Sequence, residues 1–149
     1  MRKINKINEK SELIKSFEIM KELRTDLTLD SFLCLFDVME QEGYELYALY
    51  DEDTIQALAG ITIKTNFYNK KHLYIYDLVT TSKARSSGYG KDIMLFLQEY
   101  ATKNNCQYIA LESGLQRLDA HRFYEDKINF DKFCYSFRKE VIGNSLLTK

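Results

Sequence analysis

Hydrophobic residues recur along this chain with two periods, one typical of helices and one typical of strands. The helical period predicts helices from Ser11, which can cap the first of them, to Leu23, from Leu29 to Gln41, and across 91–103. The expected apolar stripes are Phe32, Leu33, Phe36, Val38 and Met39 in the second helix and Ile93, Met94, Leu97, Tyr100 and Ala101 in the third. Strands are expected at 2–8, as a short edge strand, and at 44–50, 55–65, 107–113 and 131–141, around a central strand that starts near residue 73. A short helix is expected at 118–126. The resulting order, βααβββαβαβ, indicates an α/β chain with a mixed sheet.

Composition limits the classes of protein to which the chain can belong. Its length of 149 residues and its hydrophobic content of 45% suit one folded domain that spans 1–149. A net charge of -1 argues against nucleic acid as the main partner, because nucleic-acid binding needs a basic surface. No apolar run approaches the length of a membrane span, and Met1–Lys6 lacks the apolar core of a signal peptide.

The cysteines point to a reducing compartment. Cys34, Cys106 and Cys134 are odd in number and widely spaced, which fits neither a zinc site nor a disulfide framework. We therefore expect reduced, mostly buried thiols in a cytoplasmic protein.

A loop rich in serine and glycine joins the central strand to the helix that follows it. The loop and the start of the helix read Arg85, Ser86, Ser87, Gly88, Tyr89, Gly90 and Lys91. Gly88 and Gly90 can adopt φ > 0 and have no Cβ to block a close approach. Backbone N–H groups at the helix N-terminus, together with the Arg85 guanidinium, suit a phosphate group. A dinucleotide fingerprint would need glycine in place of Ile93, and a Walker A loop would need it in place of Arg85, so both kinds of nucleotide-binding loop are disfavoured.

The remaining pattern, Arg-x-x-Gly-x-Gly between a strand and a helix, resembles the pyrophosphate loop of the GNAT (GCN5-related N-acetyltransferase) superfamily. A second segment, 119–130, resembles the C-terminal pattern of that family, with Ala120 and a Phe-Tyr pair. Asn129 stands where glycine is usual, and Asn also tolerates a left-handed turn. The predicted order of elements is similar to the GNAT fold along essentially the whole chain. The resemblance implies acetyl-coenzyme A as co-substrate and no metal.

The resemblance also implies which residues contact acetyl-coenzyme A. They are Leu78, Val79 and Thr80 at the end of the central strand, the loop residues 85–91, and Asp119, which stands near the usual Asn of the second pattern. The backbone N–H of Val79 or Thr80 would polarise the acetyl carbonyl.

Attack of an amine on a thioester needs a base for the amine and an acid for the departing thiolate. Tyr124, at the family's Phe-Tyr position, is the expected acid. Asp77 and Glu112, each late in a strand, are both candidates for the base, because burial in an apolar strand can tune a carboxylate for that task. His121 shares a helical face with Tyr124 and is expected to contact the substrate. Arg24 is expected to be a surface charge.

The leading hypothesis is an N-acetyltransferase that moves an acetyl group to a primary amine by direct attack in a ternary complex. The alternative is a non-catalytic sensor of acyl-coenzyme A with the same fold; Tyr124 and the phosphate loop favour the enzyme. The acceptor, a small-molecule or peptide amine, is not readable, because variable helices and loops would form its site. A homodimer is left open as the oligomeric state.

Overall fold

The structure is a computed structural model that describes residues 1–84, 87–113 and 117–141, with residues 118 and 119 described by their backbone only. The chain divides into two compact units, Met1–Leu111 and Glu112–Lys149, and each is described by itself. Among the described residues, no helix is long and apolar enough to cross a membrane.

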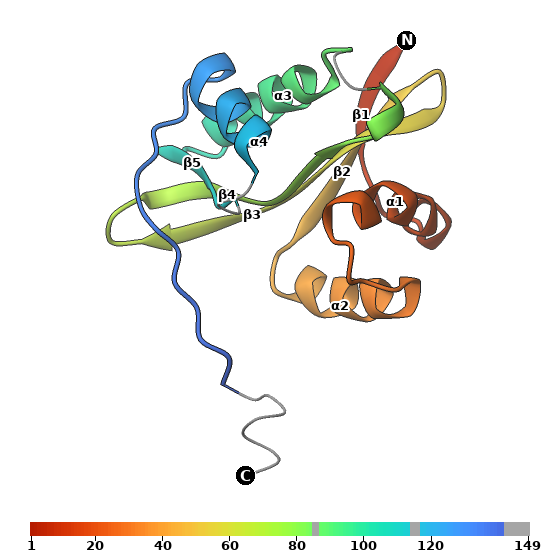
Figure 1. Ribbon diagram of the computed structural model, residues 1–149, viewed down its shortest axis with the longest axis horizontal. Helices are drawn as coiled ribbons and strands as arrows, with labels where there is room; N and C mark the ends of the chain where they lie inside the picture. The colour runs from red at the N-terminus through yellow and green to blue at the C-terminus, as the bar shows by residue number, and fades with distance from the viewer. Residues whose placement is uncertain (85–86, 114–116, 142–149) are drawn as a thin grey trace. The chain divides into compact units, whose positions relative to one another are not determined.

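The first unit is built on a five-stranded sheet with the strand order β1-β2-β3-β4-β5 (Figure 1). Its strands are β1 (Arg2–Lys6), β2 (Glu45–Asp51), β3 (Thr54–Asn66), β4 (Lys70–Thr80) and β5 (Tyr108–Leu111). Strands β1 to β4 pair antiparallel, whereas β4 and β5 pair parallel. The mixed sheet and the edge position of β1 are as predicted, and β5 is shorter than the expected 107–113.

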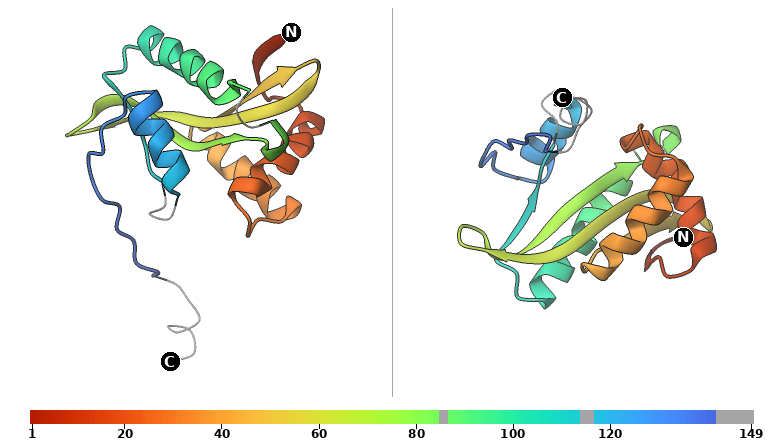
Figure 2. Two further views of the ribbon diagram at one scale, coloured as in Figure 1. Left: turned by 45° about the horizontal axis from the view of Figure 1, so that its top comes forward. Right: turned by 90° about the horizontal axis from the view of Figure 1, so that it is seen from below.

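Helices cover both faces of this sheet. Two of them, α1 (Lys10–Leu23) and α2 (Leu29–Gln41), lie on one face, and α3 (Tyr89–Lys103) lies on the other (Figures 1 and 2). Helix α2 has the predicted bounds and begins with a capping box between Thr28 and Ser31. Helix α1 begins at Lys10 after Glu9, which makes no side-chain capping bond. The prediction that Ser11 caps α1 is therefore wrong, because Ser11 already lies inside the helix.

Apolar layers hold the helices on the sheet. The layer between the sheet and the pair α1 and α2 contains Leu46, Ala48 and Leu58, all 0% exposed. On the other face, the buried residues of α3 include Ile93, Met94, Leu97 and Ala101 of the predicted stripe, whereas its fifth residue, Tyr100, is half-buried. Each layer takes alternate residues of the strands, because successive strand side chains point to opposite faces. The sheet is thus buried on both sides where the helices cross it.

Two predictions about burial are wrong. Val38 of the expected α2 stripe is 53% exposed, because Phe32 and Phe36 already occupy the buried side of that helix. The cysteines are free thiols, as predicted, but Cys34 and Cys134 are exposed. A cysteine is small enough to stand on the outer side of a helix at little cost, so its type alone does not fix its burial.

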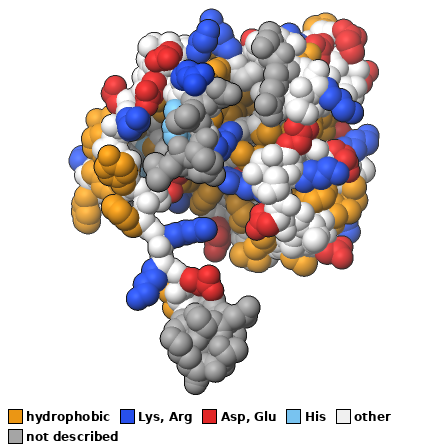
Figure 3. Space-filling view, viewed as in Figure 1, with side chains coloured by type: hydrophobic (Ala, Val, Ile, Leu, Met, Phe, Trp, Pro, Cys, Tyr) orange, Lys and Arg blue, Asp and Glu red, His pale blue; other side chains and the backbone are white. Residues whose placement is uncertain are grey.

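The outer side of α1 carries charged pairs. Lys15 lies 3.0 Å from Glu12, and Lys21 lies 2.9 Å from Glu18, each pair spaced by three residues along the helix. Figure 3 shows acidic and basic side chains mixed over α1 and α2. Pairs of this kind add little stability at a solvated surface, but they keep the outer face polar.

The second unit is helical where its fold is regular. Helix α4 (Leu118–Arg122) continues into a π-helical turn, Phe123–Lys127, which confirms the helix predicted at 118–126. Asn129 follows with φ of 58°, so it adopts the left-handed turn expected at this position. The N–H of Phe130 then donates to the carbonyl of Tyr124 at 2.6 Å and closes the turn.

The strand predicted at 131–141 is not a strand in the structure. This segment has no regular secondary structure, and its alternating aromatic residues Phe133, Tyr135 and Phe137 are 70%, 77% and 90% exposed. Alternation predicts a strand only where a neighbouring strand supplies hydrogen bonds and an apolar layer covers one face. The observed element order therefore lacks the last β of the predicted βααβββαβαβ.

Candidate active site

Strand β4 loses one neighbour along its length. It pairs with β5 only from His72 to Ile75, whereas its ladder with β3 continues to Thr80. Among the described residues, no strand pairs with the β5 side of β4 beyond Ile75. Successive strand residues point their backbone groups alternately to the two sides, and the N–H of Thr81 donates to Gln56 of β3 at 2.9 Å. Val79 therefore also points its backbone groups toward β3, whereas Leu78 and Thr80 point theirs to the side without a strand partner, which we call the open end of β4.

Helix α3 begins close after this open strand end, with a glycine at its N-cap. Gly88 has φ of 82°, the left-handed region in which glycine carries no penalty, and it directly precedes the first helical residue, Tyr89. The N–H of Asp92 makes the first bond of the helix, to the carbonyl of Gly88 at 3.0 Å. The N–H groups of 89–91 precede that bond and point out of the helix end. Gly90 lies inside the first turn of the helix. Both glycines were predicted to be able to adopt the left-handed conformation, but only Gly88 does so.

A clamp that the sequence did not reveal fixes this helix end. Arg2 of β1 donates to the carboxylate of Asp92 at 2.6 Å and to the carbonyl of Ser87 at 2.7 Å. Its guanidinium carbon also lies 4.2 Å from the ring centroid of Tyr89, a cation–π distance. One arginine from the edge strand thus holds both sides of the Gly88 turn.

Tyr89 extends the clamp into the sheet. Its ring is buried, and its hydroxyl donates to the carboxylate of Asp51 at the end of β2, at 2.7 Å. This hydrogen bond, helped by the nearby N-terminal ammonium and Arg2, lowers the pKa of Asp51. Tyr89 is a predicted cofactor contact. Its side chain anchors the loop to β2, so its backbone N–H is the group that remains for a ligand.

A β-bulge brings Asp77 to the α1 and α2 face of the sheet. The register of β3 and β4 shifts at Gly60 and Ile61, where Gly60 pairs with Asp77 and Ile61 pairs with Ile75. Tyr76 is the extra residue between these pairs, so Tyr76 and Asp77 both turn toward the same face. Sequence alone gave no signal for this bulge.

The carboxylate of Asp77 is buried and held by two donors. The Tyr44 hydroxyl donates to Oδ2 at 2.7 Å, and Nε of Arg24 donates to Oδ1 at 3.0 Å. Arg24 also donates to the carbonyl of Tyr76 at 2.7 Å, so it is no simple surface charge. Burial, then the neighbouring Asp77 carboxylate, raises the pKa of Tyr44 well above its usual range, which keeps this hydroxyl a donor.

Gly60 makes room for this arrangement. A Cβ at Gly60 would overlap the hydroxyl and ring of Tyr44. The missing side chain on β3 therefore lets the Tyr44 ring lie against the bulge and reach Asp77. Tyr44 lies far from Asp77 in the sequence, so only the folded sheet reveals the pair.

Four of the remaining predicted residues, Glu112, Asp119, His121 and Tyr124, belong to the second unit. Tyr124 is buried, 8% exposed, between the rings of Phe123 and Phe130 at centroid distances of 5.8 and 5.9 Å. His121 is half-buried in α4, while Glu112 is exposed directly after β5. For Asp119 the structure describes the backbone in α4, and Arg85 and Ser86 lie outside the described residues.

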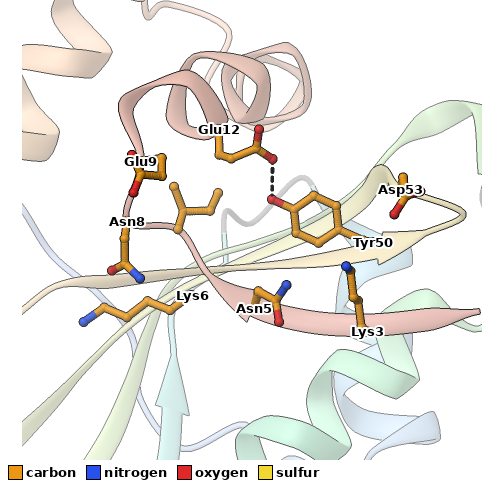
Figure 4. Close-up of a pocket in the computed structure, with 9 residues that line it drawn as sticks. Lys3, Asn5, Lys6, Asn8, Glu9, Glu12, Tyr50 and Asp53 are labelled. Atoms are coloured by element: carbon orange, nitrogen blue, oxygen red, sulfur yellow. Dashed lines mark hydrogen bonds between the residues drawn. The ribbon is translucent and has the colours of Figure 1, made fainter.

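A separate cavity of about 390 Å³ lies where β1 leads into α1. Figure 4 shows Lys3, Lys6 and Glu9 at its walls and the Tyr50 hydroxyl bonded to Glu12. None of the residues that line it comes from the end of β4 or from the start of α3. This polar cavity is therefore not the predicted cofactor site.

Comparisons with known proteins agree with the geometry of β4 and α3. The Acetyltransferase (GNAT) family matches residues 10–130. YhdJ of Bacillus subtilis (strain 168), described as an uncharacterized N-acetyltransferase, is 41% identical over 139 residues, which span 93% of this chain and 98% of the relative.

Solved structures share the fold at lower identity. A transcriptional regulator from Bacillus halodurans C-125 has a TM-score of 0.78 at 20% identity, over 94% of this chain and 99% of that chain. The aminoglycoside N-acetyltransferase AAC(6')-Iy in complex with CoA has a TM-score of 0.82 at 14% identity, over 95% of this chain and 96% of that chain. The chain therefore belongs to the Acetyltransferase (GNAT) family and is an acyltransferase whose co-substrate is acetyl-coenzyme A.

Proposed function

We propose that this enzyme acetylates a primary amine of a small molecule or peptide by direct attack on acetyl-coenzyme A in a ternary complex. The observation that carries the proposal is the open end of β4 beside the glycine-capped N-terminus of α3. An extended amide-bearing arm can bind along open strand groups, and a pyrophosphate suits a helix N-terminus. A coenzyme A thioester contains both the amide-bearing arm and the pyrophosphate.

The pyrophosphate contacts come from the loop and the first turn of α3. In the proposal, the backbone of Ser87, Gly88, Tyr89, Gly90 and Lys91 faces the phosphates, with Arg85 and Ser86 added from the sequence pattern. The clamp of Arg2 on the Gly88 turn supports this assignment, because a rigid anion site has its donors in place before the ligand arrives. Asp119 stays a predicted contact to the same ligand.

The acetyl carbonyl accepts a hydrogen bond from the open end of β4. Of the two predicted donors, Val79 and Thr80, the backbone N–H of Thr80 is the one proposed, because that of Val79 points toward β3. The backbone of Leu78 faces the arm that leads to the thioester. A fixed donor of this kind stabilises the oxyanion of the tetrahedral intermediate, which has more negative charge than the starting carbonyl.

The amine reaches the reaction as an ammonium ion and must lose a proton. Asp77 and Glu112 remain the two proposed bases. A carboxylate has about four acceptor positions, and Asp77 uses two of them for Tyr44 and Arg24. It therefore keeps capacity for the acceptor ammonium or for a water that carries the proton away. His121 is the proposed further contact to the acceptor.

The proposed reaction balances in two steps. The lone pair of the neutral amine forms a C–N bond to the acetyl carbon, and the carbonyl π electrons move to the oxygen. The oxyanion then re-forms the carbonyl, the C–S bond breaks, and the thiolate takes the proton of the Tyr124 hydroxyl. The proton from the amine nitrogen restores the tyrosine through the base or water.

The test uses the purified full chain, acetyl-coenzyme A and a panel of amines. We expect acetyl-coenzyme A to raise the melting temperature by mass action, and at least one amine to cause release of coenzyme A thiol together with an acetylated product. Aminoglycosides, polyamines, amino sugars and peptides with free N-termini form the panel. Stabilisation by acetyl-coenzyme A without thiol release for any amine would favour the sensor reading instead.

The compartment and the oligomeric state complete the proposal. The free thiols fit the cytoplasm, where acetyl-coenzyme A is also available.

The exposed aromatic residues of 131–141 suit an interface in a homodimer. Sedimentation velocity on the full chain distinguishes a dimer from a monomer, and the triple variant Phe133→Ser, Tyr135→Ser, Phe137→Ser should shift a dimer toward the monomer.

A further inference from the structure

Three tyrosine rings form a row on the α1 and α2 face of the sheet. The ring centroids of Tyr74 and Tyr76 on β4 are 5.1 Å apart, and those of Tyr76 and Tyr44 are 5.5 Å apart. Tyr74 and Tyr76 share this face because they are two residues apart on the strand, and the bulge brings Asp77 to the same face. The row ends at Asp77, which accepts a hydrogen bond from the Tyr44 hydroxyl.

One cation already lies on two of these rings. The ammonium nitrogen of Lys64, on the neighbouring strand β3, lies 4.4 Å from the centroid of Tyr74 and 4.9 Å from that of Tyr76. Both distances fall within the range in which an aromatic ring attracts a cation. Tyr74 and Tyr76 are half-buried, and partial desolvation strengthens this attraction. The geometry is therefore that of a site for an alkylammonium group, filled by the protein's own lysine.

The ring pair lies at a distance from the proposed reaction centre. A strand rises about 3.3 Å per residue, so Val79 lies about 10 to 16 Å along β4 from Tyr76 and Tyr74. The amine that attacks the acetyl group near Val79 cannot also be the cation on these two rings. A second positive charge on the same acceptor could reach them if a flexible chain of that length joined it to the reacting amine.

We propose that Tyr74 and Tyr76 bind a second ammonium group of a linear, aliphatic acceptor, which takes the place of the Lys64 ammonium. This inference rests on the proposed function, because it names the class of the acceptor. The acceptor is a flexible di- or polyamine whose charges lie about 10 to 16 Å apart. Lys64 acts as a built-in competitor that fills the rings when no acceptor is present.

The first arm of the test measures KM for acceptors of different lengths. Spermine and spermidine are compared with putrescine and with butylamine, using thiol release at saturating acetyl-coenzyme A. We expect KM to be lowest for the longer polyamines. Tyr74→Leu should raise KM for spermine about threefold to tenfold, the usual worth of a cation–π contact, while Tyr74→Phe should restore most of the affinity. The KM of butylamine should change in neither variant.

The second arm uses Lys64→Met, which removes the competing cation and keeps an unbranched side chain that is one heavy atom shorter. We expect a lower KM for spermine in this variant. Lys21→Met is the matched control, because Lys21 lies over the ring of Phe17 on α1, at 6.0 Å, in another part of the first unit. A higher KM for spermine in Lys64→Met would overturn the proposal, because Lys64 would then support spermine binding instead of competing with it.

The third arm separates this site from the proposed function. Calorimetry of spermine with the wild-type chain, without acetyl-coenzyme A, measures binding alone. Spermine binding that weakens in Tyr74→Leu and strengthens in Lys64→Met supports the site even if no amine is acetylated. Acetylation of other amines with no spermine binding, or spermine binding that Tyr74→Leu leaves unchanged, overturns the site and leaves acetyl transfer intact.

Discussion

The hydroxyl of Tyr44 lies 2.7 Å from Oδ2 of Asp77, and this bond ties the start of β2 to the bulge of β4. Arg24, at the C-terminal end of α1, holds the other carboxylate oxygen at 3.0 Å. A buried carboxylate is costly unless it is paired and hydrogen-bonded. These two donors therefore decide both where the Asp77 carboxylate points and whether the bulge is stable.

Tyr44→Phe removes the hydroxyl and keeps the ring. Since a hydrogen bond to a charged group contributes about 1.5–3 kcal/mol, we expect a loss of unfolding free energy in that range, measured by urea titration. Tyr108→Phe, at an exposed position on β5, is the control and should change stability by less than about 0.5 kcal/mol. Equal, small effects of the two substitutions would contradict the role of the Tyr44–Asp77 bond.

Gly60→Ala tests the space that the bulge leaves for Tyr44. The added methyl group would overlap the Tyr44 hydroxyl and ring, so we expect a loss of about 1–3 kcal/mol or more from overpacking. In a Tyr44→Leu background the same change should cost much less, because the clashing ring is gone. A double-mutant cycle in urea measures this coupling, and additive costs would show that Gly60 is needed for another reason.

Arg2→Ala tests the clamp on the Gly88 turn. We expect the affinity for acetyl-coenzyme A to fall about tenfold in calorimetry, because the N–H groups at the start of α3 lose their fixed orientation. Lys3→Ala on the same strand should leave the affinity unchanged. Arg2→Lys should resemble Arg2→Ala, because one ammonium cannot reach Ser87 and Asp92 as a guanidinium fork does. Full affinity in Arg2→Ala would show that the contacts of Arg2 are not needed for binding of acetyl-coenzyme A.

The Tyr50 hydroxyl gives a pH prediction. Burial, then the hydrogen bond to Glu12 at 2.7 Å, raises the pKa of Tyr50 to about 12. Because the raised pKa belongs to the folded state, this contribution to stability is complete below about pH 10 and is lost as pH rises through about 12. The stability difference between the wild type and Tyr50→Phe should therefore be present at pH 8 and shrink across that window.

An absorbance titration of tyrosinate checks the same pKa directly. The wild-type spectrum minus that of Tyr50→Phe should show one hydroxyl that titrates near pH 12. N-acetyltyrosinamide in the same buffer is the reference, because an unperturbed tyrosine hydroxyl titrates at about pH 10. A Tyr50 hydroxyl that ionises together with this free reference would mean that the contact between β2 and α1 is absent in solution.

Tyr124→Phe tests the proposed acid. The ring stays in place between Phe123 and Phe130, so affinity for acetyl-coenzyme A should survive. Turnover should fall by about 10²–10⁴-fold, the usual worth of a positioned general acid. Turnover close to that of the wild type would leave the hydroxyl with a structural role only, since water could then protonate the thiolate.

Local patterns predicted most elements of the fold. The bounds of α2 and the buried stripe of α3 follow from helical spacing, and the left-handed Asn129 follows from its place in the family pattern. The predicted strand at 131–141 failed for a physical reason, because alternation states which face is apolar but not whether a neighbouring strand is available. Burial of single residues such as Val38 and Cys34 also depends on neighbours that the local pattern does not contain.

The candidate site was also predictable only in part. The glycine-capped start of α3 was visible as a motif, because its conformation depends on residues close together in the chain. The roles of Arg2, Arg24 and Tyr44 were not visible, because each acts on a residue far away in sequence. The bulge that turns Tyr76 and Asp77 to one face depends on the register of two long strands, and no local signal in the sequence set that register.

Binding of acetyl-coenzyme A at the start of α3 is the central claim, and one calorimetric comparison tests it most directly. The wild-type chain and Gly90→Val are titrated with acetyl-coenzyme A. Gly90 lies in the first turn of α3, where a branched Cβ would stand among the N–H groups that receive the pyrophosphate. We expect tight binding by the wild type and none by Gly90→Val, with a normal far-ultraviolet spectrum for both. Equal affinity of the two proteins would contradict the site.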